Sequence, residues 1–579
     1  MAELPSFARR FFEADETFTV IGAGEIGGKA AGLRRAREVL GGRPASLRFE
    51  RLSIEVPTLT VIGTAVFQEF LVLNRLDPQE LAARDDREIA HAFQSGDLPP
   101  AILGDLWALV REVRSPLAVR SSSRLEDALA HPFAGVYATK MTPNNQHDPE
   151  SRFRRLTEAV KFVFASTFLE GARAYRAALG GAATGEAMAV IVQEVVGRRH
   201  GPRFYPDVSC VARSLNFYPF GPARPEDGMM SLALGLGKQI VDGGRCFTVS
   251  PRHPQAGPPF ASTRAVLDET QASFWAVNMG PPPPHDPAAE TEYLVLGTLD
   301  HAEQDGALGF AASTYDPTRD RIVPGLAAKG PRVLDFAPLR VWDELPWGAA
   351  VRGLLARFED ALGAPVELEL AATFGDGGGR LGFLQVRPMP AGGDETAISD
   401  FELADPAAVV VSERALGHGA LAGLRDVVFL KPSFDMRESR AAAQDLVEMN
   451  RTLLAEERPY LLIGFGRWGS SDPWLGVPVA WGQVAGARAL VEASPAGRGI
   501  ELSQGSHFFH NLLGLGVPYL QVAQGGADRI DWEFLLALPR VRETPRVIHA
   551  ASNAALCVRV DGRHGRGLVL SPRGEADRG

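Results

Sequence analysis

The sequence predicts an α/β protein of several domains, and three observations carry that prediction. Short β-branched runs alternate with helical patterns from about residue 17 onward, an alternation typical of α/β folds. The chain has 579 residues, which is more than one hydrophobic core serves. Hydrophobic residues make up 45% and charged residues 22% of the chain, a composition that excludes a wholly disordered, collagenous or coiled-coil protein.

A first domain is expected over residues 1–395. In chain order its expected elements are a strand at 18–21, a helix at 29–40, a strand at 59–62, helices within 66–112, a strand at 117–120, helix over 151–179 and a strand at 187–196. Consecutive prolines from Pro281 to Pro284 and several turn dipeptides indicate an irregular insertion over about 250–345. A helix near 346–362 and strands at 366–373 and 381–386 complete this domain.

The second half of the chain predicts another, smaller α/β domain. The segment near 390–405 has the composition of a linker. Beyond it, short apolar runs alternate with glycine-rich turns and a helical pattern at 437–456. We therefore expect a compact domain over 405–527, followed by a tail of short strands over 528–579.

The net charge and the cysteine content indicate which classes of binding partner and which cell compartment to expect. The formal net charge is -10, which does not favour binding to nucleic acid or to an anionic membrane. The three scattered cysteines favour a reducing compartment. There is no secretory pattern at the N-terminus and no run of 18 apolar residues. A cytoplasmic protein with small-molecule partners is expected, and a homodimer is left open.

A glycine-rich turn, Gly22 to Leu33, follows the first strand and opens a helix. Glycines let the backbone approach phosphate oxygens, and a lysine adds a point charge. Gly27, Gly28 and Lys29 are therefore candidates for phosphate binding. The alternative is a tight strand-to-helix turn without a ligand.

Two further motifs offer charged side chains. Arg120, Ser121 and Ser122 leave a strand within VRSSSRLED, and a guanidinium group with hydroxyls suits phosphate oxygens; a serine-rich surface turn is the alternative. Glu367 and Glu369 share one face of a strand and precede the Gln385-Val386-Arg387 run on the next strand. Such a set could hold Mg²⁺ and a triphosphate, whereas exposed glutamates on an edge strand are the alternative.

These motifs together resemble a known family. GGKAAGL, VRSSSRLED with a following FAG, VIVQEVV, LGLGKQIVDG and LQVRP occur in the order found in the ATP-grasp nucleotide-binding domain of the pyruvate phosphate dikinase and phosphoenolpyruvate synthase family. The resemblance covers about residues 17–390. It implies ATP and Mg²⁺ as cofactors.

The resemblance also implies roles for individual residues. Lys29 and Arg120 would contact ATP phosphates, Glu194 and Glu367 would lie at the nucleotide, Glu369 and Gln385 would hold the metal, and Arg387 would face the transferred phosphates. Two departures stand out: Lys238 replaces a common glutamate, and His131-Pro132 replaces small residues before FAG. Either departure could alter nucleotide preference or turnover.

His507 is the candidate phosphoryl carrier. The family's swivelling phosphohistidine domain has a Ser/Thr-His followed by glycine nine residues and proline eleven residues later, and His507 meets both intervals with Gly516 and Pro518. A histidine at the start of a helix suits this role, because the helix dipole stabilises a charged adduct and a neutral imidazole is a nucleophile. Phe508 and Phe509 depart from the family's small residues. The alternatives are a capping or core histidine, a role for His510 instead, or a His/His metal pair.

The loop Gly464–Gly476 concentrates glycine, tryptophan, arginine and hydroxyl groups. It could form an acceptor pocket in which Trp468 or Trp474 stacks on a ring or sugar. A buried aromatic turn is the alternative.

The expected function is an ATP-dependent phosphotransferase of the dikinase type that phosphorylates His507 and then an unknown acceptor. An ADP-forming kinase or ATPase and a non-catalytic nucleotide-binding regulatory module are the alternatives. Pyruvate is the acceptor by family only, because relatives bind it on a (β/α)₈ barrel of roughly 250 residues, for which this chain has no room after the two domains.

Overall fold

The computed structural model describes most of the chain, and contacts divide it into two compact units. The described residues are 4–8, 17–41, 46–49, 51–124, 126, 136–178, 187–216, 221–257, 263–342, 345–375, 377–389, 397–417, 419–470, 472, 474–494, 508, 517–523, 526–562 and 564–571. The first unit comprises residues 1–173, 182–240 and 245–389, and the second comprises 174–181, 241–244 and 390–579. The mixed sheets and helices confirm the predicted α/β class.

A five-stranded sheet begins the first unit. Its order is β1-β4-β7-β5-β6, with β1 (Phe18–Ile21), β4 (Leu59–Ile62), β7 (Met188–Glu194), β5 (Leu117–Ser123) and β6 (Thr139–Thr142). β1 and β4 are parallel, and the other neighbours are antiparallel. β4 is buried along its whole length, and its one polar side chain, Thr60, donates its hydroxyl to the Thr19 carbonyl.

Helices accompany this sheet in the order that the sequence predicts. They are α2 (Thr64–Leu73), α3 (Pro78–Leu81), α4 (Asp86–Ser95), α5 (Pro100–Glu112), α6 (Pro149–Ser166) and α7 (Glu170–Ala178). Asp85 and Glu88 form a capping box at the start of α4, and Asp148 caps α6. The rings of Phe67, Phe70 and Phe164 pack together between α2 and α6.

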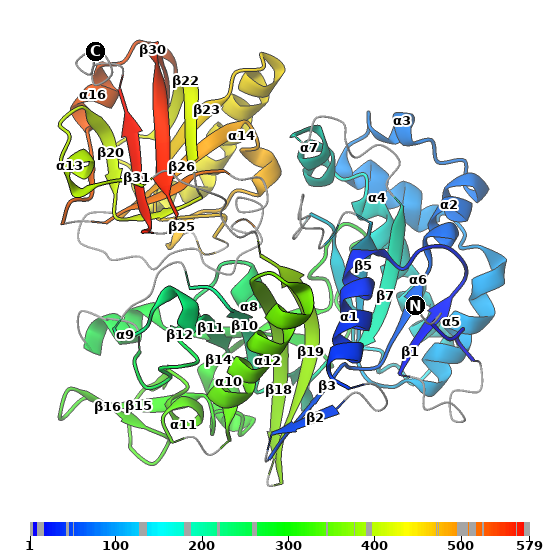
Figure 1. Cartoon of the computed structure of the whole chain (residues 1–579). Helices are drawn as coiled ribbons and strands as arrows, with labels where there is room; N and C mark the ends of the chain where they lie inside the picture. Colours follow the sequence, from blue (N-terminus) through cyan, green and yellow to red (C-terminus); the bar gives the residue numbers. More distant parts are fainter. Residues whose placement is uncertain are drawn as a thin grey trace. The chain divides into compact units, whose positions relative to one another are not determined.

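A seven-stranded sheet forms the other half of the first unit. Its order is β12-β11-β10-β18-β19-β3-β2, with β12 (Phe247–Val249), β11 (Met229–Ala233), β10 (Val208–Arg213), β18 (Val366–Gly375), β19 (Gly378–Pro388), β3 (Leu52–Glu55) and β2 (Ser46–Phe49). β18 and β19 are its long central hairpin, with α12 (Trp347–Leu362) packed on β18 (Figure 1). Also present are η2 (Pro225–Asp227) and α8 (Lys238–Val241).

The segment predicted to be an irregular insertion contains regular structure, so that prediction is wrong. β13 (Ser273–Asn278) and β14 (Leu294–Thr298) join β8 (Arg198–His200) and β9 (Arg203–Tyr205) in a sheet of order β14-β13-β9-β8. β15 (Ala312–Asp316), β16 (Arg321–Pro324) and β17 (Arg332–Leu334) form a second small sheet. The helices are α9 (Thr263–Glu269), α10 (Leu299–Gln304) and α11 (Ala337–Arg340). The proline run lies in the connection between β13 and β14, so it interrupts no strand.

The second unit is built on one ten-stranded sheet. Along its main path the order is β21-β27-β26-β23-β22-β30-β31-β20-β28, and β29 pairs with β30. The strands are β20 (Ala408–Ser412), β21 (Arg414–Leu416), β22 (Gly419–Leu430), β23 (Tyr460–Phe465), β26 (Ala487–Ala493), β27 (Tyr519–Val522), β28 (Arg529–Ile530), β29 (Arg540–Glu543), β30 (Val547–Asp561) and β31 (Arg566–Leu570). β22, β23, β26 and β27 run parallel.

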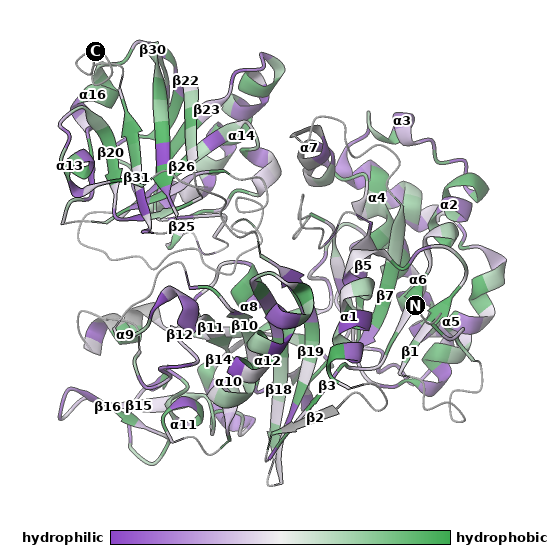
Figure 2. Cartoon of the chain, viewed as in Figure 1, coloured by the Kyte–Doolittle hydropathy of each residue, from purple (hydrophilic) through white to green (hydrophobic). Residues whose placement is uncertain are grey.

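The remaining elements of this unit connect or cover those strands. They are α13 (Asp400–Leu403), η3 (Met436–Glu438), α14 (Ser439–Ala455), the small pair β24 (Arg467–Trp468) and β25 (Gly476–Val477), η4 (Trp481–Gln483) and α16 (Trp532–Ala537). Figure 2 shows apolar residues along the strands and polar residues on outer turns of helices such as α12 and α14.

Two parts of the second unit differ from the sequence expectation. The residues set apart as a tail supply β30 and β31, which lie inside the sheet between β22 and β20. The described end of the predicted linker, 397–405, includes α13, which begins with a Ser399/Glu402 capping box. Arg559 pairs with Glu402, and Arg566 pairs with Asp400. This segment is therefore bound to β30 and β31.

Among the described residues, no helix combines the length and apolar character needed to cross a membrane.

Candidate nucleotide-binding site

Helix α1 (Gly27–Val39) brings the two large sheets of the first unit together, because it packs on both β5 and β19. Its first two residues must be glycine. A Cβ on Gly27, where φ is 73°, would lie 1.7 Å from the backbone oxygen of Ser122, and a Cβ on Gly28 would lie 1.6 Å from that of Glu126. Gly27 and Gly28 were predicted to let the backbone approach phosphate, and in the structure they let the backbone of Ser122 and Glu126 approach closely.

The serines after Arg120 are buried in β5, so the predicted alternative of a surface turn is wrong for them. The Ser122 hydroxyl accepts from the Ala30 backbone N–H at 3.0 Å and donates to the Ile26 carbonyl at 2.7 Å. These bonds satisfy groups at the start of α1, which has no side-chain cap of its own. The helix start is therefore held in place by β5.

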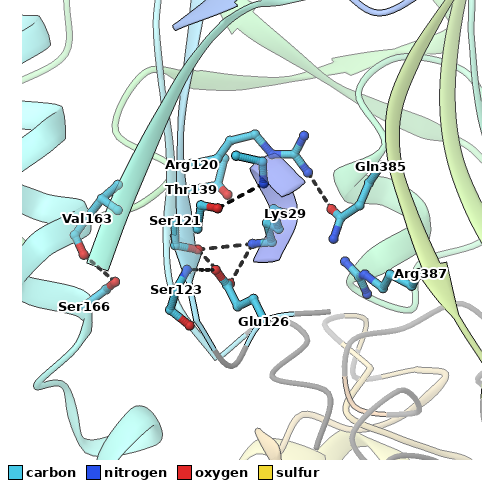
Figure 3. A network of polar contacts seen from close by, with 12 residues as sticks. Lys29, Arg120, Ser121, Ser123, Glu126, Thr139, Val163, Ser166, Gln385 and Arg387 are labelled. Atoms are coloured by element: carbon cyan, nitrogen blue, oxygen red, sulfur yellow. Dashed lines mark hydrogen bonds and ion pairs between the residues drawn. The ribbon is translucent and has the colours of Figure 1, made fainter. Parts of the chain in front are cut away.

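Lys29 forms a buried ion pair at this junction (Figure 3). Its Nζ lies 2.8 Å from Glu126 Oε1 and donates to Ser121 Oγ at 3.1 Å. Glu126 also accepts from the Ser121 hydroxyl and, at 2.8 Å, from the Ser123 backbone N–H. An ammonium group has three N–H donors, so two partners leave one donor for a phosphate oxygen.

A second ion pair joins the same two loops at the surface. Arg124 donates to both carboxylate oxygens of Glu25, at 2.6 and 3.0 Å. The hydrogen bond from Arg124 lowers the pKa of Glu25, and Glu25 in turn raises the pKa of Arg124. Both side chains are exposed. The pair therefore links the turn before α1 to the loop after β5 but adds little to the free energy of unfolding.

Arg120 links the five-stranded sheet to the seven-stranded one. Its NH2 donates to Gln385 Oε1 at 2.7 Å, and its NH1 donates to the Leu384 carbonyl at 2.9 Å and to Gln193 Oε1 at 3.3 Å. The pairing of β18 with β19 skips Leu384, which is the extra residue of a β-bulge. A bulge leaves its residue outside the ladder, and here that carbonyl accepts from Arg120.

Alternating charges continue across three strands. Arg213, Glu367 and Arg387 lie directly opposite one another on β10, β18 and β19. Arg213 Nε donates to Glu367 Oε2 at 2.7 Å, and Arg387 NH2 donates to Glu369 Oε1 at 2.9 Å. Arg120 NH2 lies 3.6 Å from Glu369 Oε2. Glu367 and Glu369 therefore stand on a central strand, and the predicted alternative of an exposed edge strand is wrong.

Exposure rises along this row of charges. The exposed fraction of the side chain is 0% for Arg213 and 2% for Glu367, but 12% for Arg120 and 16% for Glu369. Among the described residues, this network contains four cations, Lys29, Arg120, Arg213 and Arg387, and three carboxylates, Glu126, Glu367 and Glu369. In Figure 3 the Arg120 and Arg387 side chains extend toward the same space beside Gln385, and the Lys29 ammonium group points toward Ser121 and Glu126. An anion such as a triphosphate suits that space.

The structure brings most of the predicted residues together and leaves one apart. Lys29, Ser121, Arg120, Gln385, Glu369, Arg387 and Glu367 form the continuous network described above. Glu194 stands on the opposite face of β7 from Gln193 and accepts from the Ser115 hydroxyl at 2.6 Å. Gln193, Glu126 and Arg213 were missed. The period of two along VIVQEVV could have indicated Gln193, whereas Arg213 has no local signal.

A comparison with models of protein families identifies the family of this chain. The family model described as pyruvate phosphate dikinase, AMP/ATP-binding domain, matches residues 23–402. The chain belongs to this family. In a comparison with curated proteins, none matched the chain. The first unit thus contains most of this AMP/ATP-binding domain, and the matched range extends through most of α13.

The residues of this dikinase-type domain fit a magnesium ion that arrives with a nucleotide. Glu369 and Gln385 offer carboxylate and amide oxygens, the donors that Mg²⁺ prefers, and Mg²⁺ commonly takes its remaining ligands from phosphates and water. No group of three or more His, Cys, Asp or Glu side chains able to hold a metal occurs in the described part of the chain.

In the second unit, the loop Gly464–Gly476 is largely a buried turn in its described part. Trp468 is 1% exposed, donates from its indole N–H to the Val491 carbonyl at 3.1 Å and lies against Gly464. The expectation that Trp468 stacks on an acceptor is wrong, because its ring is enclosed. Trp474 remains 51% exposed.

His507 and His510 lie outside the described residues, as do His131 and Pro132. The neighbouring Phe508 is described. It is buried and packs against Gly469, and its ring centroid lies 5.8 Å from that of Trp481. The large side chain that departs from the family pattern thus serves as an apolar anchor in the second unit.

Proposed function

We propose that this chain is an ATP- and Mg²⁺-dependent phosphotransferase of the dikinase type, which transfers a phosphoryl group from ATP to His507 and then to an acceptor. The observation that supports it best is the shared carboxylate of Glu369, which pairs with both Arg120 and Arg387. Two guanidinium groups from different sheets converge on one accessible point. Phosphoryl transfer needs this arrangement, because its catalysis is mainly positioning and charge stabilisation.

Each residue has a role in this proposal. Lys29 donates its remaining N–H to a phosphate oxygen, and Arg120 binds the outer phosphates while its Leu384 and Gln193 contacts hold the guanidinium plane. Arg387 stabilises the phosphoryl group that moves. Glu369 and Gln385 would hold Mg²⁺, and the bound ion would neutralise negative charge on the phosphates.

The carrier step would use the segment that connects β26 to β27, which contains His507. A neutral imidazole nitrogen attacks the β-phosphorus, the bond to the α-phosphate oxygen breaks, and AMP leaves with that electron pair. The γ-phosphoryl group passes to water or inorganic phosphate. The support is the interval from His507 to Gly516 and Pro518.

Labelling with ATP carrying ³²P at the β-position tests this proposal. We expect acid-labile label on the unchanged chain and on His510→Ala, none on His507→Ala, and AMP as the nucleotide product. Lys29→Ala should abolish both label and product. Label on His507→Ala would assign the carrier role elsewhere.

Chromatography of the products separates the two alternatives. An ADP-forming kinase or ATPase yields ADP without label on the protein. A regulatory module binds ATP but forms no more AMP or ADP than the Lys29→Ala control. The observation that favours this alternative is the ion pair in which Glu126 already occupies Lys29. With AMP release as the readout, a screen of small acceptors, pyruvate included, then identifies the acceptor.

A further inference from the structure

Arg213 is a buried arginine that neither the motifs nor the proposed chemistry uses. It is the last residue of β10, its side chain is 0% exposed, and it stands directly opposite Glu367 on β18. Its Nε donates to Glu367 Oε2 at 2.7 Å. The register places Arg387 opposite the other side of Glu367, so Glu367 lies between two arginines.

Stability alone does not account for such a pair. Removing two charges from water costs several kcal/mol per ion, and buried ion pairs are often no more stabilising than apolar residues of similar size. A role in fixing the geometry of neighbouring groups is the better explanation, and the neighbouring group here is Arg387.

The distances show how Arg387 is shared. Its NH1 lies 3.9 Å from Glu367 Oε1, too far for a hydrogen bond, whereas its NH2 donates to Glu369 Oε1 at 2.9 Å. Glu367 thus holds Arg213 tightly and Arg387 loosely. The firm bond of Arg387 goes to Glu369, on the accessible side of the row.

We propose that Arg213 is a positioning residue for Arg387: by engaging Glu367, it keeps the Arg387 guanidinium directed toward Glu369 and the outer phosphates of the nucleotide. Without Arg213, the charge of Glu367 acts more strongly on Arg387. Charges attract strongly in a dry interior, so Arg387 moves inward and away from the phosphates. Glu367 itself pairs with arginines on both neighbouring strands. This inference rests on the proposed function for the placement of the phosphates.

The test compares ATP with AMP, because AMP lacks the phosphates that Arg387 faces. Calorimetric titration of the full chain with each nucleotide, in Mg²⁺, is done for the unchanged protein and for Arg213→Met, Arg213→Lys and Arg213→Met/Glu367→Gln. For Arg213→Met we expect ATP affinity to fall about tenfold and AMP affinity to stay unchanged. Arg213→Lys keeps the charge and should recover most of the loss.

The double variant decides between positioning and direct binding by Glu367. It removes both charges, so Arg387 is no longer drawn inward, and ATP affinity should return to within about threefold of the unchanged chain. Persistent weakness in the double variant would make Glu367 a nucleotide ligand and overturn the inference. Equal weakening of ATP and AMP in Arg213→Met would show a structural role and also overturn it.

Product formation is a separate measurement. If the unchanged chain binds ATP but forms neither AMP nor ADP, the proposed function fails. The ratio of ATP affinity to AMP affinity in the variants still tests the positioning role of Arg213. If the unchanged chain does not bind ATP, both fail.

Discussion

Lys29 Nζ lies 2.8 Å from Glu126 Oε1, with 7% and 0% of the two side chains exposed. The pair joins the start of α1 to the loop after β5, so the group proposed to meet ATP also holds two chain segments together. Binding and stability are therefore coupled at this lysine, and a pair of variants can separate them.

Lys29→Met should destabilise the chain by about 3 kcal/mol, because it leaves a buried carboxylate without its cation. Lys29→Met/Glu126→Gln should regain most of that stability but none of the ATP affinity. Urea unfolding and calorimetric ATP titration measure the two effects, with the exposed Lys329→Met as control. A double variant as unstable as the single one would contradict the assigned ion pair.

Gly28→Ala should cost about 3 kcal/mol and abolish ATP binding, because the new Cβ would meet the Glu126 backbone oxygen and force the loop after β5 away from α1. Gly309→Ala is the matched control, since no atom lies within 4 Å of its Cβ position. Thermal unfolding measures the melting temperatures of Gly28→Ala and Gly309→Ala. Similar melting temperatures for the two variants would contradict the close approach of the Glu126 backbone to Gly28.

Stability of the second unit should decrease in acid through Glu402. Burial acts to raise the pKa of Glu402, but hydrogen bonds from the Ser399 backbone and Arg559 outweigh it and lower the pKa to about 2. A carboxyl group whose folded pKa lies below its ordinary value stabilises the fold above that ordinary value and loses this effect as the pH falls through the folded pKa. The loss is therefore expected between about pH 4.5 and pH 2.

Glu402→Gln should lower stability by about 1 kcal/mol at pH 7 and by progressively less below pH 4. Calorimetric unfolding of the full chain at several pH values measures this difference. An effect of the substitution that is constant with pH would assign the acid dependence to other groups.

Trp468→Ala should destabilise the chain by about 4 kcal/mol, because the enclosed ring leaves a large cavity. Trp474→Ala should leave unfolding unchanged, since half of its surface is already in solvent. Chemical unfolding of both variants tests this contrast. Once an acceptor is identified, Trp474→Ala also shows whether this ring contributes to its binding.

The local patterns of the sequence predicted the site elements well. Apolar runs with glycine-rich ends predicted β1, α1, β5, β18 and β19, because period and turn chemistry are local properties. The same reasoning failed for residues 250–345, where several strands find their partners far along the chain. The family resemblance implied a nucleotide-binding role for Glu194, but the pleat of β7 turns this side chain toward Ser115 and presents Gln193 to Arg120.

By itself the sequence determined the α/β class, the family and most of the residues proposed to bind phosphate, since these depend on residue types at short spacing. Only the tertiary structure decided how those residues are held. The register of β10, β18 and β19 pairs Arg213 with Glu367, a bulge frees the Leu384 carbonyl for Arg120, and the approach of β5 to α1 encloses Lys29 with Glu126. Such contacts join residues up to 264 positions apart, so they follow from strand pairing and packing, which no local pattern records.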